Sequence, residues 1–230
     1  MQAVILAAGR GTRMKELTDE TPKPLLEVEG KTLLEHKFET LLGSVDEIII
    51  IVGYLGEKIQ EACGDSYSGI PISYVKQETL DGTGGALWTA RSLLKNRFIV
   101  MMGDDLYSKE DVQAAIQTND WAGGVWKAES ISSGGTMVLG EDGTIQDIVE
   151  GDHEGRSGFV HTGLLSLDTR LFNYPLIPKS MGSIEFGLPQ TVLAASKEGA
   201  IPFYGLPATG WFQVTSPEDL VRAREWIERR

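Results

Sequence analysis

The chain opens on the stretch Ala3-Val4-Ile5-Leu6-Ala7-Ala8-Gly9-Arg10-Gly11-Thr12-Arg13-Met14, in which a short apolar run leads directly into a glycine-rich loop. The apolar run predicts a buried strand, and the glycines allow backbone N–H groups to turn inward toward a polyanion. A dinucleotide-binding fingerprint would need a further glycine where Met14 stands, and a P-loop would need Gly-Lys-Ser or Gly-Lys-Thr, which is absent. The stretch therefore predicts a strand followed by a phosphate-binding turn of a different kind.

Short β-rich runs alternate with helical patterns through the first half of the chain, as is typical of parallel βαβ units in a doubly wound sheet. Ligands of such sheets bind outside the carboxyl ends of the strands, which makes Asp104 and Asp105, directly after one predicted strand, candidate site residues. The expected strands are Val4–Leu6, Glu47–Val52, Ile72–Val75 and Phe98–Met102, and the expected helices are Leu33–Leu42, Gly56–Ala62 and Gly84–Leu94.

The second half carries shorter predicted strands separated by glycine-rich turns, and it ends in a helix with Ser216 as N-cap and Pro217 at its first position. These strands are Gly123–Lys127, Thr136–Leu139, Ile145–Glu150 and Val160–Leu167. We expect an α/β fold, a Rossmann-like doubly wound mixed, mainly parallel sheet with helices on both faces and a smaller β-rich subregion. The chain is expected to form a single domain over 1–230, with halves 1–120 and 121–230.

Composition narrows the classes of function. The 33 acidic residues outnumber the 21 Lys and Arg residues, and the formal charge of −12 argues against binding to nucleic acid, which requires a basic face. Cys63 is the single cysteine, so no internal disulfide or Cys-based zinc site can form, and a reducing compartment, the cytoplasm, is expected. No apolar stretch approaches the ~20 residues of a membrane span, so no membrane partner is expected, whereas a homo-oligomer stays open.

A second motif, Thr21-Pro22-Lys23-Pro24-Leu25, holds a lysine between two prolines, which stiffen the backbone and keep the ammonium group in one place. Together with the glycine-rich loop and with Gly30-Lys31-Thr32-Leu33-Leu34, this motif resembles the signature of the sugar-1-phosphate nucleotidyltransferases. The resemblance runs through most of the chain. It is to the catalytic domains of N-acetylglucosamine-1-phosphate uridylyltransferases and glucose-1-phosphate thymidylyltransferases.

The resemblance implies that 1–120 is a nucleotide-binding half and 121–230 a sugar-phosphate-binding half. Arg13 and Lys23 would bind phosphate oxygens, where fixed cations act on the charge that develops during phosphoryl transfer. The nucleotide-binding residues of the glycine-rich loop would be Leu6, Ala8, Gly9, Gly11 and Thr12.

A middle motif, Gln77-Glu78-Thr79-Leu80-Asp81-Gly82-Thr83-Gly84-Gly85-Ala86, lies between an expected strand and an expected helix. Family members that bind uracil or thymine place a glutamine and a Gly-Thr pair at similar spacing, so Gln77, Gly82 and Thr83 would contact the base. A flexible turn is the alternative interpretation, and related guanylyltransferases carry similar loops. UTP or dTTP is favoured on this pattern.

Asp104 is the expected Mg²⁺ ligand, because hard carboxylate oxygens beside a triphosphate suit that ion and the family places a metal ligand at this position. Asp105 is expected to cap the next helix or to hold the loop. Many relatives carry a second metal-binding aspartate where this chain has Gln213, within Trp211-Phe212-Gln213-Val214. An amide oxygen can still bind Mg²⁺ but carries no charge, so weaker metal binding is expected.

The second half matches the family less closely. A lysine that often contacts phosphate in relatives is replaced by Gly151, and His161 stands where relatives have a sugar-binding asparagine. A purely structural histidine is an equally good interpretation of His161. The expected sugar-binding residues are Glu150, His161, Thr162 and Glu185.

The reaction implied is transfer of a nucleotidyl group from a nucleoside triphosphate to a sugar 1-phosphate resembling N-acetylglucosamine or glucose 1-phosphate, with Mg²⁺ as cofactor and Arg13, Lys23 and Asp104 as catalytic residues. One alternative is a cytidylyl- or guanylyltransferase acting on phosphocholine or another phosphorylated acceptor, which an aromatic cage would indicate. Another is a nucleotide-binding regulatory protein with weakened catalysis. No hexapeptide repeat is present, so one reaction is expected.

Overall fold

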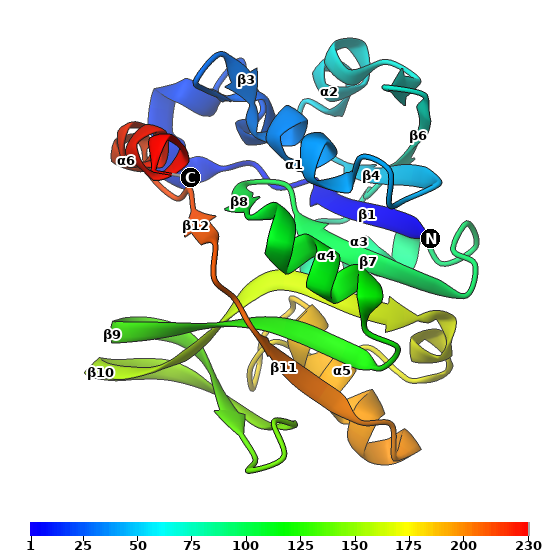
Figure 1. Cartoon of the computed structure of the whole chain (residues 1–230), viewed down its shortest axis with the longest axis vertical. Helices are drawn as coiled ribbons and strands as arrows, with labels where there is room; N and C mark the ends of the chain where they lie inside the picture. The colour runs from blue at the N-terminus through cyan, green and yellow to red at the C-terminus, as the bar shows by residue number, and fades with distance from the viewer. Residues whose placement is uncertain (230) are drawn as a thin grey trace.

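The computed structural model describes residues 1–229 and is organised around one eight-stranded sheet. The strands of this sheet are β1 (Gln2–Ala7), β4 (Glu47–Val52), β5 (Ser66–Tyr67), β6 (Ile70–Lys76), β7 (Arg97–Met102), β9 (Trp121–Leu139), β10 (Ile145–Asp168) and β11 (Phe203–Pro207). They lie in the order β11-β9-β10-β7-β1-β4-β6-β5. Figure 1 shows the run from β11 to β6. The run β7-β1-β4-β6 is parallel, and β10 pairs antiparallel with both β7 and β9. The predicted mixed, mainly parallel α/β fold is confirmed.

Helices cover both faces of the sheet, because the central strands are apolar on both sides. In β4, Ile48 and Ile50 face one core cluster and Ile49 and Ile51 face the other, as expected for a strand buried on two faces. The first cluster is covered by α1 (Leu33–Leu41), α2 (Gly56–Cys63) and α4 (Lys109–Gln117), and the second by α3 (Gly82–Thr89) and α5 (Leu188–Gly199).

A third, smaller core cluster joins the two ends of the chain. Met14 packs there with Val214 and Ala223, which belongs to the last helix, α6 (Pro217–Glu228). The predicted N-cap of α6 is confirmed, because Ser216 forms a reciprocal capping box with Asp219. The remaining elements are the short strands β2 (Glu27–Val28), β3 (Lys31–Thr32), β8 (Asp105–Tyr107) and β12 (Trp211–Gln213), and the 3-10 helices η1 (Thr12–Thr18), η2 (Lys23–Leu25) and η3 (Thr169–Asn173).

Two predicted boundaries were wrong. The helix expected to reach Leu94 ends at Thr89, and the chain continues in turns in which the N–H groups of Ala90 and Leu93 each donate to the carbonyl three residues earlier. The side chain of Gln2 holds the end of this segment through hydrogen bonds with the carbonyl of Leu93 (3.0 Å) and the N–H of Lys95 (2.7 Å). The four short strands expected in the second half form the two long strands β9 and β10, which extend past their neighbours in Figure 1. The glycines between the predicted strands bend the chain without ending its ladder of hydrogen bonds.

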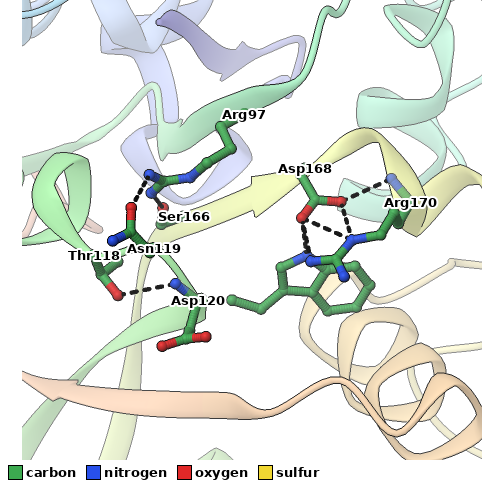
Figure 2. A network of polar contacts seen from close by, with 8 residues as sticks. Arg97, Thr118, Asn119, Asp120, Ser166, Asp168 and Arg170 are labelled. Carbon is green, nitrogen blue, oxygen red and sulfur yellow. Dashed lines mark hydrogen bonds and ion pairs between the residues drawn. The ribbon is translucent and has the colours of Figure 1, made fainter.

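Side-chain contacts at the amino end of β7 join the two halves of the sheet (Figure 2). Arg97 donates a hydrogen bond to the hydroxyl of Ser166 on β10 (3.1 Å). Asp168, at the end of β10, accepts one from the indole of Trp121 on β9 (3.0 Å). These contacts lie at the opposite end of β7 from Asp104, so they support the sheet without entering the candidate site.

The chain crosses back from β11 to the first half before α6 begins. Asp111 of α4 holds this crossing, because its carboxylate accepts hydrogen bonds from the N–H groups of Thr209 and Gly210. The crossing ends in β12, which pairs with β8 so that Gln213 lies opposite Asp105. Within residues 1–229, no helix has both the length and the apolar character needed to cross a bilayer.

Candidate active site

A cavity of about 580 Å³ opens above the carboxyl ends of β1 and β7, between the two halves of the chain. It brings together most of the residues that the sequence singled out, although they come from distant segments. The predicted residues that line it are Leu6, Ala8, Gly9, Gly11, Lys23, Gln77, Gly82, Thr83, Asp104, Glu150, His161, Glu185 and Gln213. This position is the one expected for a ligand site in an open α/β sheet.

Three predicted residues do not line the cavity. Thr12 and Arg13 lie exposed in η1, and Thr162 is buried, with its hydroxyl donating to the carbonyl of Gly124 at 3.2 Å. Arg10 lines the cavity instead of Arg13, and its guanidinium lies 5.0 Å from the ring centre of Tyr54. Motif spacing alone could not separate these two arginines of the same loop.

Lys23 and Asp104 form an ion pair inside the cavity, with 2.6 Å between Nζ and Oδ2. The side chain of Lys23 is 7% exposed and that of Asp104 is 33% exposed. Lys23 begins the 3-10 helix η2 between two prolines, which fixes its backbone as the sequence predicted. Gly11, at φ 65°, lies so close that a Cβ there would be 3.0 Å from the Cβ of Lys23, so the loop needs glycine at this point.

Asp105, the next residue, is buried. It accepts a hydrogen bond from the indole of Trp211 (3.0 Å), while Ser108 is the N-cap of α4. Of the two roles expected for Asp105, capping the next helix or holding the loop, the first was wrong, because Asp105 lies in β8, before the helix. Burial raises the pKa of Asp105 well above its usual value, and the neighbouring charge of Asp104 adds to the increase.

A lysine that the sequence did not single out lies behind this acidic pair. Lys37 is 1% exposed, and its ammonium donates to the carbonyl of Leu33 at 2.9 Å. Burial lowers the pKa of Lys37 to about 8, and the charges of Asp104 and Asp105 oppose that decrease. The burial of Lys37 could have been predicted from its position among the apolar residues of the amphipathic helix α1.

Two elements offer oxygen atoms that could bind a divalent cation. Asp104 and Gln213 both line the cavity, and their carboxylate and amide oxygens are the hard ligands that Mg²⁺ prefers. In the part of the chain that the structure describes, no group of three or more His, Cys, Asp or Glu residues could hold a metal ion. A cation held by Asp104 and Gln213 would have to take its remaining ligands from phosphate oxygens and water.

The middle motif forms the wall of the cavity next to α3. Gln77 is buried, and its amide donates to Asp81 (2.9 Å) and to the carbonyl of Gly82 (3.2 Å). Gly82 adopts φ 96°, and a Cβ there would be 2.5 Å from the carbonyl oxygen of Phe186. Only glycine fits this contact between the middle motif and the loop that precedes α5.

Glu150 is held in place at the end of the cavity formed by the second half. Its Oε1 accepts a hydrogen bond from Gln190 of α5 (2.8 Å), and a Cβ at Gly135 would lie 2.8 Å from the same oxygen. Gln190 also lines the cavity, although no sequence motif marks it. Its signal was weak, because a glutamine in the first turn of a helix is ordinary.

His161 lies in the floor of the cavity with one ring nitrogen already used. Its Nδ1 accepts from the N–H of Gly163 (2.9 Å), so the proton of the neutral ring is on Nε2. Among the described residues Nε2 has no hydrogen-bond partner, and it is buried against Gly123, where a Cβ would be 2.9 Å away. Burial lowers the pKa of His161 to about 4, which keeps the ring neutral near pH 7.

Aromatic residues contribute little to the cavity. Trp126 and Trp211 pack against each other with 6.4 Å between ring centres, and no tryptophan of residues 1–229 lines the cavity. Phe186 is the aromatic residue among the described lining residues. An aromatic cage for a quaternary ammonium group, which the phosphocholine alternative would require, is therefore not formed by these residues.

Comparisons with known proteins point to one family. A family model described as nucleotidyl transferase matches residues 2–230. The UTP–glucose-1-phosphate uridylyltransferase AglF of Haloferax volcanii is 29% identical over 99% of this chain and 97% of its own length. The bifunctional protein GlmU of Methanococcus maripaludis is 31% identical over 97% of this chain, which spans 53% of that protein.

A solved structure shows the same fold. HddC from Yersinia pseudotuberculosis, complexed with GMP-PN, matches this chain with a TM-score of 0.74 and 23% sequence identity. The match covers 98% of this chain and 99% of that one. At this identity the likeness concerns the fold.

Proposed function

Because the chain belongs to the nucleotidyl transferase family, it is a nucleotidyltransferase, and we propose that it transfers a nucleotidyl group from UTP or dTTP to a sugar 1-phosphate resembling N-acetylglucosamine or glucose 1-phosphate. The observation that carries this proposal is the single cavity in which the glycine-rich loop, Lys23 and Asp104 face Glu150 and Glu185. Residues 1–120 would bind the nucleotide and residues 121–230 the sugar phosphate. The reducing compartment expected from the single cysteine is the cytoplasm.

The reaction needs positioning and charge rather than a protein nucleophile. The second pKa of a phosphate monoester is about 6, so the acceptor is already mostly a dianion near pH 7. One of its phosphate oxygens attacks the α-phosphorus without a general base, and the bond from that phosphorus to the β-phosphate oxygen breaks, which releases pyrophosphate. Lys23 holds a positive charge within the cavity, where it stabilises negative charge on the phosphates. The backbone of Gly9 and Gly11 lets the triphosphate approach closely.

Asp104 and Gln213 would hold Mg²⁺, which supplies charge neutralisation on the phosphate oxygens when it is bound. Lys23 pairs with Asp104 in this structure, so the two side chains fix each other before substrates enter. Arg13 is placed in the same catalytic set by its motif, although its side chain lies outside the lining of the cavity. Glu150, oriented by Gln190, would accept hydrogen bonds from sugar hydroxyls.

The proposal is tested by measuring pyrophosphate release with Mg²⁺ for UTP, dTTP, CTP and GTP, each crossed with several acceptors. The acceptors are N-acetylglucosamine 1-phosphate, glucose 1-phosphate, N-acetylmuramic acid 1-phosphate, mannose 1-phosphate and phosphocholine. We expect UTP or dTTP with one of the first two to dominate. Dominance of CTP with phosphocholine, or of GTP, would refute the proposed substrates, and nucleotide binding without any pyrophosphate release would refute the reaction.

A further inference from the structure

Lys179 is a cation of the cavity that has no role in the reaction outlined above. Lys179 lies in the segment between η3 and α5, is exposed, and lines the cavity. Lys23 is paired with Asp104, and Arg10 stacks over a tyrosine ring, whereas Lys179 makes no hydrogen bond or ion pair through its side chain with any described residue. An unpaired ammonium at a substrate cavity is available to a ligand.

The backbone that carries Lys179 is fixed against the middle motif. The N–H of Lys179 donates to the carbonyl of Glu185 (2.8 Å), which closes the segment into a loop. Phe186 then exchanges hydrogen bonds with the middle motif, donating to the carbonyl of Asp81 (2.7 Å) and accepting from the N–H of Gly84 (2.9 Å). These backbone hydrogen bonds hold the Cα of Lys179 at the edge of the cavity, whereas its exposed side chain is not held by them.

Lys179 is at the end of the cavity that holds Glu150. A Cβ built on Gly187 would be 1.9 Å from Oε1 of Gln190 and 3.2 Å from the Cα of Lys179, so both residues border the same glycine. Gln190 in turn donates to Glu150. Lys179, Gln190 and Glu150 therefore converge from a loop, a helix and a strand on one end of the cavity.

Charge balance indicates what Lys179 binds. The other two cations that line the cavity, Arg10 and Lys23, come from the first half of the chain. The second half contributes the acids Glu150 and Glu185, and Lys179 is its one cation among the described lining residues. A phosphate dianion that enters this end of the cavity meets carboxylates, and it needs a cation from the same end to offset their repulsion.

We propose that Lys179 binds the phosphate group of the acceptor substrate. This inference rests on the proposed function, and it names the residue that would hold the attacking phosphate in the second half of the cavity. Ammonium–phosphate hydrogen bonds are charge-assisted and among the stronger polar contacts of proteins.

The first test compares Lys179→Gln with Lys179→Arg and with Lys197→Gln, an exposed lysine of α5 whose replacement changes the net charge equally. With the acceptor that supports turnover, we expect Lys179→Gln to raise the acceptor KM about tenfold or more, because one charge-assisted contact is lost. The nucleotide KM should stay within about twofold, Lys179→Arg should largely restore the acceptor KM, and Lys197→Gln should behave like the wild type. An unchanged acceptor KM in Lys179→Gln, or an equal rise in both glutamine variants, would overturn the assignment.

A binding measurement separates this inference from the proposed reaction. Inorganic phosphate and glucose 1-phosphate are titrated calorimetrically into wild type and Lys179→Gln, both saturated with a non-hydrolysable nucleoside triphosphate analogue and Mg²⁺. Weaker binding of both probes to the variant supports the role of Lys179 even if no acceptor is turned over. Equal binding to the two proteins, or no binding of either probe to the wild type, would refute it.

Discussion

Replacement of Asp111 by alanine is expected to destabilise the fold and to disturb the active site together. The carboxylate is 8% exposed and accepts four hydrogen-bond contacts, two from the N–H of Thr209 (2.9 and 3.0 Å), one from its hydroxyl (2.9 Å) and one from the N–H of Gly210 (2.8 Å). These contacts fix the crossing from β11 to β12. The perturbation therefore acts on the segment that places Gln213 in the cavity.

The expected magnitude follows from the partners that are left behind. A hydrogen bond to a charged group contributes about 1.5–3 kcal/mol, and a buried donor left unsatisfied costs a similar amount. The N–H of Gly210 is buried, whereas the groups of Thr209 are partly exposed and water can replace part of their bonding. We therefore expect Asp111→Ala to lower the free energy of unfolding by about 3 kcal/mol.

Urea unfolding followed by circular dichroism measures this loss. Glu110→Ala is the matched control, because Glu110 is an exposed acid in the same first turn of α4 and its removal has a similar effect on the helix dipole. Turnover of the folded Asp111→Ala protein should also fall, since Trp211, the hydrogen-bond donor to Asp105, follows Gly210 directly. A loss below about 1 kcal/mol, or a loss equal to that of Glu110→Ala, would show that these hydrogen bonds do not hold the crossing.

Three further outcomes are expected. Gly82→Ala should destabilise the fold by about 1–3 kcal/mol through backbone strain, and it should raise the nucleotide KM because the new Cβ meets Phe186. Gly64→Ala is the control: its backbone is also left-handed, but no atom lies near the new Cβ, so the nucleotide KM should stay unchanged. The pKa of His161 is lowered to about 4 in the folded chain, so as pH falls below about 6.5 the unfolded chain takes up a proton that the folded chain does not. Between pH 7 and 4 the free energy of unfolding of the wild type, measured by urea titration, should therefore fall by about 3 kcal/mol more than that of His161→Asn. Equal decreases in the two proteins would contradict the burial of His161. Gln213→Asp should lower the Mg²⁺ concentration needed for half-maximal turnover, and an unchanged or higher requirement would count against its role as a ligand.

Much of the first half of the fold could be predicted, because its elements are marked by local patterns. The strand Glu47–Val52 was predicted with the bounds that the structure has, since a continuous apolar run between polar segments has one simple interpretation. The end of α3 could not be predicted, because apolar residues continue as far as Leu94 although the backbone leaves the helix after Thr89. Similarly, the glycines of the second half suggested breaks where the ladder between β9 and β10 continues.

The candidate site shows the same contrast between residues marked by local motifs and residues whose position depends on distant contacts. The glycine-rich loop, Lys23 and Asp104 reach the cavity because rigid motifs and strand ends determine their positions. Gln190 and Lys179 carry no motif of their own and become visible only when the loop before α5 folds against the middle motif. The orientation of His161, with Nε2 buried against Gly123, depends on packing between two strands that sequence spacing cannot reveal.

The most direct test of the account is the turnover of Lys23→Ala, measured as pyrophosphate release with the preferred nucleotide and acceptor. Lys23 is buried in the cavity and aimed at Asp104, so it is the cation on which the proposed charge stabilisation depends most. We predict that turnover falls about 100- to 1000-fold, as for the loss of one preorganised charge-stabilising donor, while the melting temperature changes little. Turnover within a few-fold of wild type in the folded variant would contradict the assignment of this cavity as the catalytic site.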